Sequence, residues 1–220
     1  DAQLMLESKW FDPSSRSDWT PLMLACMRGH VNTVSCLCEA KADVGYQNSN
    51  GWDALWVAAN DGRAEVVDVL LDLGAGELTS RRDKQGVTPL MAASQSGQSD
   101  TMRSLLEHEL NSRMHKRAVE QRKQLERGGE VDDNAADKPA EESTHEQTVR
   151  VSLRTVLLAA MLKSDTVILE SALALGADAG FQDQFGCSPG QHALQHDACS
   201  HLILRRLARA GTDLFRGRTI

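Results

Sequence analysis

Aromatic side chains are scarce in this chain of 220 residues, at 4% of the total, and only one of them is a tyrosine. That scarcity suits a helical array packed with leucine, valine and alanine, for which the 41% of hydrophobic residues is sufficient. No apolar run approaches the ~20 residues that a membrane-spanning helix needs. No secretory signal peptide is visible at the start of the sequence either.

The charge balance and the cysteines exclude further classes of protein. A net charge of −7 argues against duplex nucleic acid as the main ligand, because phosphate binding needs concentrated lysine and arginine. Five cysteines, an odd number spread along the chain, do not form the pattern of a disulfide framework. We expect Cys26, Cys36 and Cys38 to act as small buried hydrophobic residues, and the protein to be intracellular, in the reducing cytoplasm or nucleus.

One phrase recurs along the chain. A residue able to cap a helix is followed by an apolar run and then, in the first three copies, by glycine nine residues after the cap. The copies begin 33, 35, 67 and 33 positions apart, and the interval of 67 is one repeat plus an insertion of similar length. A period in this range predicts stacked supersecondary units. The five cap residues are Thr20, Asp53, Thr88, Thr155 and Ser188.

Each copy predicts a pair of helices. Proline follows the cap in three copies, at the first helical position, where its missing N–H costs nothing. The glycine then ends the first helix in a left-handed conformation. A second segment with apolar residues at helical spacing comes next, for example Val66, Val67, Leu70 and Leu71. The predicted unit is therefore helix, tight turn, helix and extended loop.

These phrases resemble the ankyrin repeat family. The matching residues are Asp18-Trp19-Thr20-Pro21-Leu22, Gly29-His30, Ala42-Asp43-Val44, Gly51-Trp52, Leu70-Leu71-Asp72-Leu73-Gly74-Ala75, Asp83-Lys84-Gln85-Gly86-Val87-Thr88-Pro89-Leu90 and Leu175-Gly176-Ala177-Asp178. The resemblance implies an all-α solenoid of helix-turn-helix units with short hairpin fingers, in about five repeats, one interrupted by a charged insertion. The histidine that the family places after Pro-Leu is replaced here, by Met23, Trp56, Met91, Leu158 and Gln191.

The resemblance divides the chain into successive units. They are a partial N-terminal repeat or cap at 1–15, repeat 1 at 16–48, repeat 2 at 49–81, repeat 3 at 82–108, the insertion at 109–148, repeat 4 at 149–182, and repeat 5 with a C-terminal cap at 183–220. Leu4 to Glu7 are similar to the end of a second helix, with Asp12-Pro13 as the following loop, so we expect the full protein to extend N-terminally. The alternative is an atypical cap in which Trp10 and Phe11 close the stack.

The insertion has two halves of opposite charge. Residues 108–127 carry a net charge of +3, and their apolar residues at near-helical spacing predict one helix from Asp100 to Arg127 that projects roughly 40 Å. Residues 130–147 carry −6 and few apolar side chains, which predicts disorder. The insertion is then a solvated loop, a partner-binding helix, or an acidic tether that folds back on the basic helix.

No arrangement of residues in the sequence supports catalysis. Gly128-Gly129 lacks the lysine and the preceding strand of a phosphate-binding loop, and no serine lies in a nucleophile elbow. Zinc accepts mixed cysteine and histidine ligands, but the paired CxxC or HExxH spacing that marks zinc sites is missing. We therefore predict no catalytic residue, no metal and no cofactor. The group considered for zinc was Cys187, His192, His196, Cys199 and His201.

The remaining candidate is a recognition surface. In ankyrin-like arrays the loop tips and first helices face the partner, so the residue before each cap and the pair ending each first helix should line it. Trp19 and Trp52 would then stand side by side, although each could instead pack on its own hairpin, and Trp56 is predicted to be core. Trp and Arg are enriched at binding hot spots. The predicted partner-binding residues are Trp19, Met27, Arg28, Trp52, Asn60, Asp61, Val87 and Arg154.

Two functions compete at this point. The first is a non-catalytic scaffold that binds a partner protein or peptide through its concave surface. The alternative is a regulatory or targeting module of a larger enzyme, channel or acyltransferase. A nucleic acid or a small molecule is disfavoured as the ligand, because no site for either stands out in the sequence.

Overall fold

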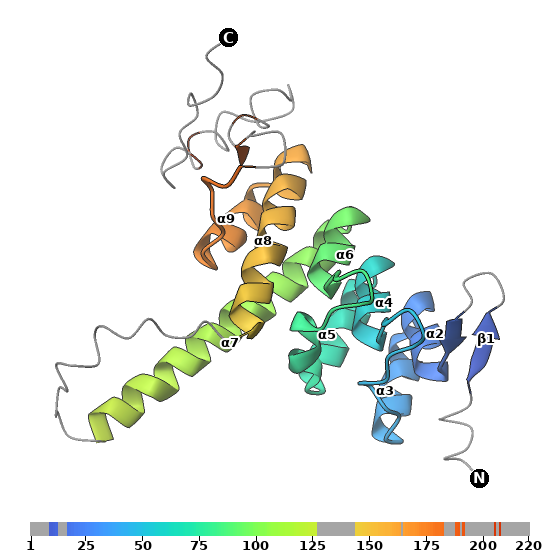
Figure 1. Ribbon diagram of the computed structural model, residues 1–220. Helices are drawn as coiled ribbons and strands as arrows, with labels where there is room; N and C mark the ends of the chain where they lie inside the picture. The colour runs from blue at the N-terminus through green and yellow to red at the C-terminus, as the bar shows by residue number, and fades with distance from the viewer. Residues whose placement is uncertain are drawn as a thin grey trace.

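The computed structural model describes residues 9–12, 17–126, 144–163 and 165–182, together with 188, 189, 191, 205 and 207. Its helices form a row of pairs that runs from the N-terminal end to α9 (Figure 1). The all-α solenoid of helix-turn-helix units is thereby confirmed. No helix in these ranges is both long and apolar enough to cross a bilayer. The pairs are α2 (Pro21–Arg28) with α3 (Val31–Glu39), α4 (Ala54–Asn60) with α5 (Ala64–Asp72), α6 (Pro89–Gln95) with α7 (Ser99–Glu126), and α8 (Thr144–Lys163) with α9 (Thr166–Ala174).

The helix starts and ends follow the recurring phrase. The side chains of Thr20, Asp53 and Thr88 each accept a hydrogen bond from the backbone N–H three residues further on, at 3.2, 2.8 and 3.3 Å. The glycine nine residues after each cap has a φ of 76°, 72° or 71°, a conformation that other residues rarely adopt. These local signals, all within one helical turn of the residue concerned, explain why the first three units form where the sequence predicts.

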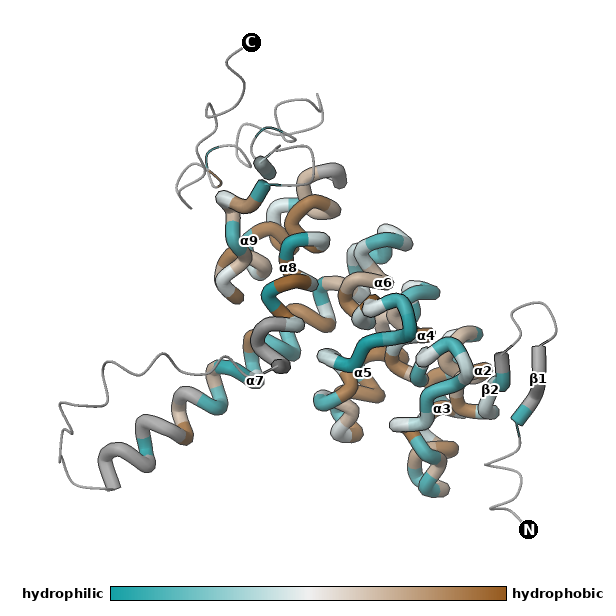
Figure 2. The backbone as a smooth tube through the Cα atoms, in the orientation of Figure 1, coloured by the Kyte–Doolittle hydropathy of each residue, from teal (hydrophilic) through white to brown (hydrophobic). Residues whose placement is uncertain are grey.

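The core lies between the two layers of helices. α4 packs between α2 and α6, and α6 packs between α4 and α8, so these two first helices are held by neighbours on both sides. Leu55, Leu70, Leu157 and Ile168 are completely buried in this core. Figure 2 shows the hydrophobic segments gathered where the pairs pack, while the described part of α7 beyond the row is mostly hydrophilic.

Three loops project beside the first helices. The first finger is the hairpin of β1 (Trp10–Asp12) and β2 (Ser17–Trp19), in which Trp10 pairs with Trp19. The second finger is residues 44–52 and the third finger is residues 81–87. The third finger follows η1 (Ala75–Ser80), a 3-10 helix that continues from α5. The predicted tail or cap at 1–15 otherwise lies outside the described residues, and so does most of 183–220.

The fourth pair begins differently from the prediction. Thr155 does not cap a helix, because α8 starts at Thr144 and runs through it without a break. Its side-chain hydroxyl instead donates to the carbonyl of Ser152, one turn earlier, at 2.7 Å. Residues 144–147 are therefore helical, although they were predicted to be disordered with 130–143, which lie outside the described residues. Buried Val149 and Leu153 extend the apolar face of α8 towards its start, and this burial stabilises the extra turns.

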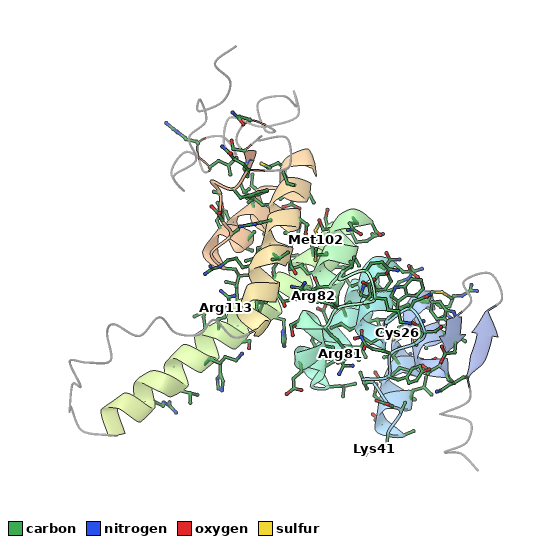
Figure 3. All side chains as sticks on the ribbon, viewed as in Figure 1. Cys26, Lys41, Arg81, Arg82, Met102 and Arg113 are labelled. Carbon is green, nitrogen blue, oxygen red and sulfur yellow. The ribbon has the colours of Figure 1, made fainter. Side chains whose placement is uncertain are left out.

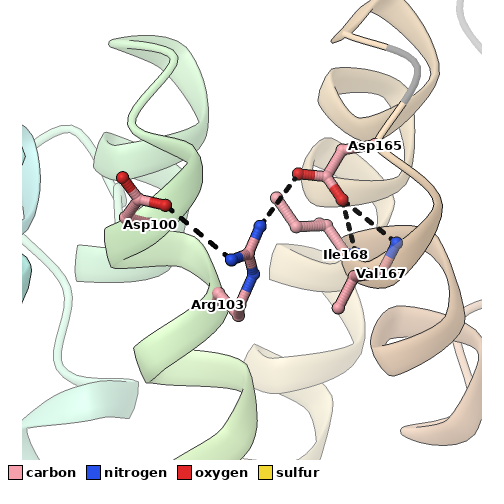
Figure 4. Close-up of polar contacts among 5 residues, drawn as sticks. All are labelled: Asp100, Arg103, Asp165, Val167 and Ile168. Carbon is pink, nitrogen blue, oxygen red and sulfur yellow. Dashed lines mark hydrogen bonds and ion pairs between the residues drawn. The ribbon is translucent and has the colours of Figure 1, made fainter.

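The long helix predicted from Asp100 to Arg127 is observed as α7, Ser99–Glu126, and its far end projects from the row (Figure 1). Two arginines of α7 hold the two ends of α9. Arg103 lies between Asp100 and Asp165, and the Oδ1 of Asp165 accepts the N–H groups of the first turn of α9 (Figure 4). At the other end Arg113 donates from Nη1 to the carbonyl of Leu175 at 2.8 Å. Residues 109–113 are thus part of the stack and not of a free projection.

Replacing Arg113 with alanine should lower the free energy of unfolding by about 2 kcal/mol. The change removes the donor to Leu175 and leaves Glu109, which is 8% exposed and paired with Arg113 at 3.0 Å, without its partner. Urea unfolding followed by circular dichroism measures the loss. Arg122→Ala, an exposed arginine on the same helix, is the control and should cost less than about 0.5 kcal/mol. Equal stability of Arg113→Ala and wild type would contradict the role of Arg113 in holding the end of α9.

Candidate recognition face

Three tryptophans gather on the side of the row that carries the fingers. The rings of Trp19 and Trp52 are 6.1 Å apart and tilted by 58°, which confirms that these two side chains stand side by side. Trp52 in turn stacks on Trp56 of α4, at 4.8 Å and nearly parallel. Both arrangements are among those that aromatic pairs favour. The tryptophan cluster, as we call it, consists of these three rings with Met23, Leu24, Met27, Tyr46 and Val57.

The cluster is separate from the main core and is only partly covered. Trp19 is buried, whereas Trp52 and Trp56 are half-buried. The indole nitrogens of Trp52 and Trp56 are shielded from solvent and have no hydrogen-bond partner among the described residues. Trp56 was predicted to be core because it takes the position of the absent family histidine. This was wrong, since its side chain is half-buried and stacks on Trp52.

The other predicted residues of the first helices extend this face. Met27 belongs to the tryptophan cluster, while Arg28 is exposed at the end of α2. Asn60 donates to the side chain of Asp61 at 2.9 Å and accepts from Ser96 at the end of α6, also at 2.9 Å. These polar side chains thus link successive first helices beyond the aromatic part of the face.

Val87 and Arg154 lie further along the row. Val87 ends the third finger and is half-buried, as Trp52 ends the second. Arg154 was predicted to lie at a fingertip, and this was wrong. Thr155 is not a cap, and α8 runs through both residues. Its guanidinium lies 3.8 Å from Asp178 and over the ring of Phe181 at 5.5 Å. The structure therefore brings Trp19, Trp52 and Met27 together and places Arg154 on the helix wall.

Two titratable groups under this face have shifted pKa values. Burial raises the pKa of Asp53 to about 6, although the N–H groups of Trp56 and Leu55 and the nearby Arg81 favour the ionised form. Burial also raises the pKa of the Cys26 thiol, which is completely buried as expected. Cys36 is exposed and Cys38 half-buried, so the prediction of three buried cysteines holds only for Cys26. A protonated buried thiol is not a nucleophile.

The described ranges hold no group of three or more histidine, cysteine or acidic side chains that could bind a metal ion. The cysteines and histidines considered for zinc lie outside those ranges. A hollow of about 460 Å³ lies between η1 and α7, lined by Glu77, His108, Glu109 and Lys116 among others. Of these groups, Glu109 is already paired with Arg113. The tryptophan cluster is the stronger candidate site.

A row of helix pairs with projecting fingers is the architecture of a helical repeat solenoid. The family model for ankyrin repeats matches residues 2–80 and 41–118, which together span just over half of the chain. The chain belongs to the ankyrin repeat family. Ankyrin repeats generally mediate protein–protein interactions and are typically non-catalytic.

Several curated proteins are similar to part of this chain. The mouse protein fem-1 homolog A-like is 32% identical over 96 residues, which is 44% of this chain and 14% of that protein. Mouse ankyrin repeat and SAM domain-containing protein 6 is 44% identical over 70 residues, which is 31% of this chain and 8% of that protein. Mouse Rabankyrin-5 is 35% identical over 82 residues, 37% of this chain and 7% of that protein. The chain thus spans 14% or less of the length of these relatives.

Proposed function

We propose that this protein is a non-catalytic scaffold that binds a partner protein or peptide through the concave face built on the tryptophan cluster. The observation that carries this proposal is the half-covered stack of Trp52 and Trp56, with two shielded indole N–H groups that have no partner among the described residues. A buried donor without an acceptor costs about 1–3 kcal/mol. A partner gains instead by covering the half-exposed rings of Trp52 and Trp56, because burying aromatic surface favours binding.

The composition of the face supports the same function. Tryptophan, tyrosine and arginine are the residues that most often dominate binding energy, and the face combines Trp19, Trp52, Tyr46 and Arg28. Of the predicted binding residues, Trp19, Met27 and Trp52 form the aromatic part of this face, and Asn60 and Asp61 continue it as a polar part. Free thiols at Cys26, Cys36 and Cys38 fit the reducing cytoplasm or nucleus as the place where this scaffold acts.

A second candidate is a regulatory or targeting module of a larger protein. The relatives support it, because the similar segment is a small fraction of each, and the names of several include a further domain, SAM in one and KH in another. The two candidates share the binding face and differ in what binding controls.

Affinity capture from native lysate tests the first candidate. The full chain and its Trp52→Ala variant serve as baits, and the affinity of any captured partner is then measured with both. We expect the substitution to weaken binding about 30-fold or more, as for a tryptophan at the centre of an interface.

Met114→Ala is the matched control, because Met114 is 68% exposed on the projecting part of α7. It should change the affinity less than about twofold, and circular dichroism should show all three baits folded. Loss of the partner with Met114→Ala alone would move the interface to α7 and sink the concave-face proposal. Equal affinity for all three baits would do the same.

A further inference from the structure

The second and third fingers share one backbone design. In the second finger the Oδ1 of Asn48 accepts the N–H groups of Asn50 and Trp52 at 2.9 and 3.0 Å, and the N–H of Asn48 donates to the carbonyl of Trp52. The third finger repeats this pattern 35 residues later, with Asp83 in the place of Asn48 and Val87 in the place of Trp52. The two turns therefore differ in side chains and not in hydrogen bonding.

Their charges differ sharply. The second finger carries Gln47, Asn48 and Ser49, all uncharged, where the third finger carries Arg82, Asp83 and Lys84. Asp83 is 8% exposed, and its carboxylate points inward to hold the turn. Arg82 and Lys84 are exposed, as is Arg81 just before them. Figure 3 labels Arg81 and Arg82. On a chain with a net charge of −7, this fingertip therefore presents positive charge to solvent.

The cationic fingertip lies next to the tryptophan cluster. The N–H of Lys84 donates to the carbonyl of Asn50 at 3.1 Å, two residues before Trp52. The side chain of Gln47 also reaches the carbonyl of Arg82, at 3.4 Å. In the other direction Arg82 donates to Thr148 on α8 at 3.1 Å. Arg154, six residues further along α8, is paired with Asp178, so the positive charge beside the aromatic anchor is that of the third finger itself.

We propose that the concave face selects an acidic peptide segment, in which a bulky apolar side chain docks on the tryptophan cluster and neighbouring aspartate or glutamate residues meet Arg82 and Lys84. This inference rests on the proposed function and adds the chemistry of the partner. An extended segment advances about 3.3 Å per residue, so the acidic residues should lie within about four positions of the anchor. Exposed charge pairs contribute modestly to affinity but strongly to selectivity and to the association rate.

The second finger supplies the residues for a variant that tests this inference. Arg82→Gln/Lys84→Ser places on the third finger the residues that the second finger carries at the same two positions, so the turn held by Asp83 should be preserved. The full chain and this variant are each used to select from a random-sequence peptide library. We expect wild type to enrich aspartate and glutamate beside an aromatic or leucine anchor. The variant should keep the preference for the anchor and lose the preference for acid.

The affinity of one selected peptide then separates the two proposals. Arg82→Gln/Lys84→Ser should weaken it about five- to tenfold at low salt, and less at high salt, because screening removes the same attraction. Selected peptides without acidic residues, or equal binding by both proteins, would overturn this inference and leave the proposed function standing. Binding that is unaffected by Trp52→Ala would instead contradict the proposed function.

Two further outcomes count against the inference. A single-stranded RNA oligonucleotide that binds more tightly than the selected peptide, and loses affinity with Arg82→Gln/Lys84→Ser, would assign the fingertip to phosphate binding. A library that yields no peptide for a folded wild-type protein would contradict both the acidic-peptide inference and the peptide-binding form of the proposed function.

Discussion

Replacing Val156 with proline should lower the free energy of unfolding by at least about 3 kcal/mol. The repeat period alone suggests the opposite, since Thr155-Val156 corresponds to Thr20-Pro21 and Thr88-Pro89, where proline occupies the first helical position. In the structure, however, Val156 lies in the interior of α8, thirteenth of its 20 residues. Proline there removes the bond to the carbonyl of Ser152 and places its ring against that carbonyl.

Ala54→Pro is the matched control for this change. Ala54 directly follows the cap Asp53 and is the first residue of α4, the position at which proline is tolerated. We expect it to cost less than about 1 kcal/mol. Val156→Ala separates the loss of a completely buried side chain, about 2 kcal/mol, from the break in the helix.

Urea unfolding followed by circular dichroism gives the three stabilities, and amide hydrogen exchange over residues 144–163 locates the damage. Because repeat arrays lose cooperativity easily, we expect exchange in α8 and α9 to rise before exchange in α2 to α5. A Val156→Pro protein as stable as Ala54→Pro would show that the helix begins at Thr155 after all.

Replacing Asp53 with threonine should stabilise the protein at neutral and alkaline pH and have little effect below about pH 4. Thr20 and Thr88 cap α2 and α6 with the same hydrogen bond, so threonine retains the cap and removes a buried charge. Burial raises the pKa of Asp53 to about 6 in the folded protein, from an ordinary value of 3.8. A shift of about two pH units corresponds to up to about 3 kcal/mol.

The direction of the effect follows from proton binding. Between about pH 4 and pH 6 the folded protein keeps a proton on Asp53 that the unfolded chain has already lost. The contribution of this carboxyl to stability is therefore greatest at low pH, falls as the pH rises through this window, and is constant above it. The advantage of Asp53→Thr over wild type should grow over the same window.

Unfolding free energies of wild type, Asp53→Thr and Asp53→Asn, measured at several pH values, check this prediction. Asparagine also caps helices well and has nearly the shape of aspartate, so both variants should show the same pH-dependent gain. A stability difference that does not change with pH would mean that the Asp53 carboxyl titrates alike in the folded and unfolded chains.

The sequence predicted those parts of the fold that depend on nearby residues. The caps at Thr20, Asp53 and Thr88 act on backbone groups three residues away, and the glycines end helices through their own backbone conformation. The long helix α7 follows from apolar residues at near-helical spacing. Trp19 and Trp52 were placed side by side because a regular period puts equivalent residues of successive units next to each other.

Where contacts between distant residues decided the outcome, the same reasoning failed. The local phrase at Thr155 is that of a helix start, yet the burial of Val149 and Leu153 against the row carries α8 back to Thr144. Trp56 was assigned to the core because it takes the place of the family histidine, but its half-buried ring stacks on Trp52 of the second finger.

The sequence by itself determined the family, the repeated helix pair and the general face on which binding residues should lie, since each depends on short-range pattern and period. Tertiary structure alone decided that α7 holds both ends of α9 and that Arg154 lies on a helix wall. Such placements depend on packing between segments that are far apart in the chain, to which local propensity and period do not extend.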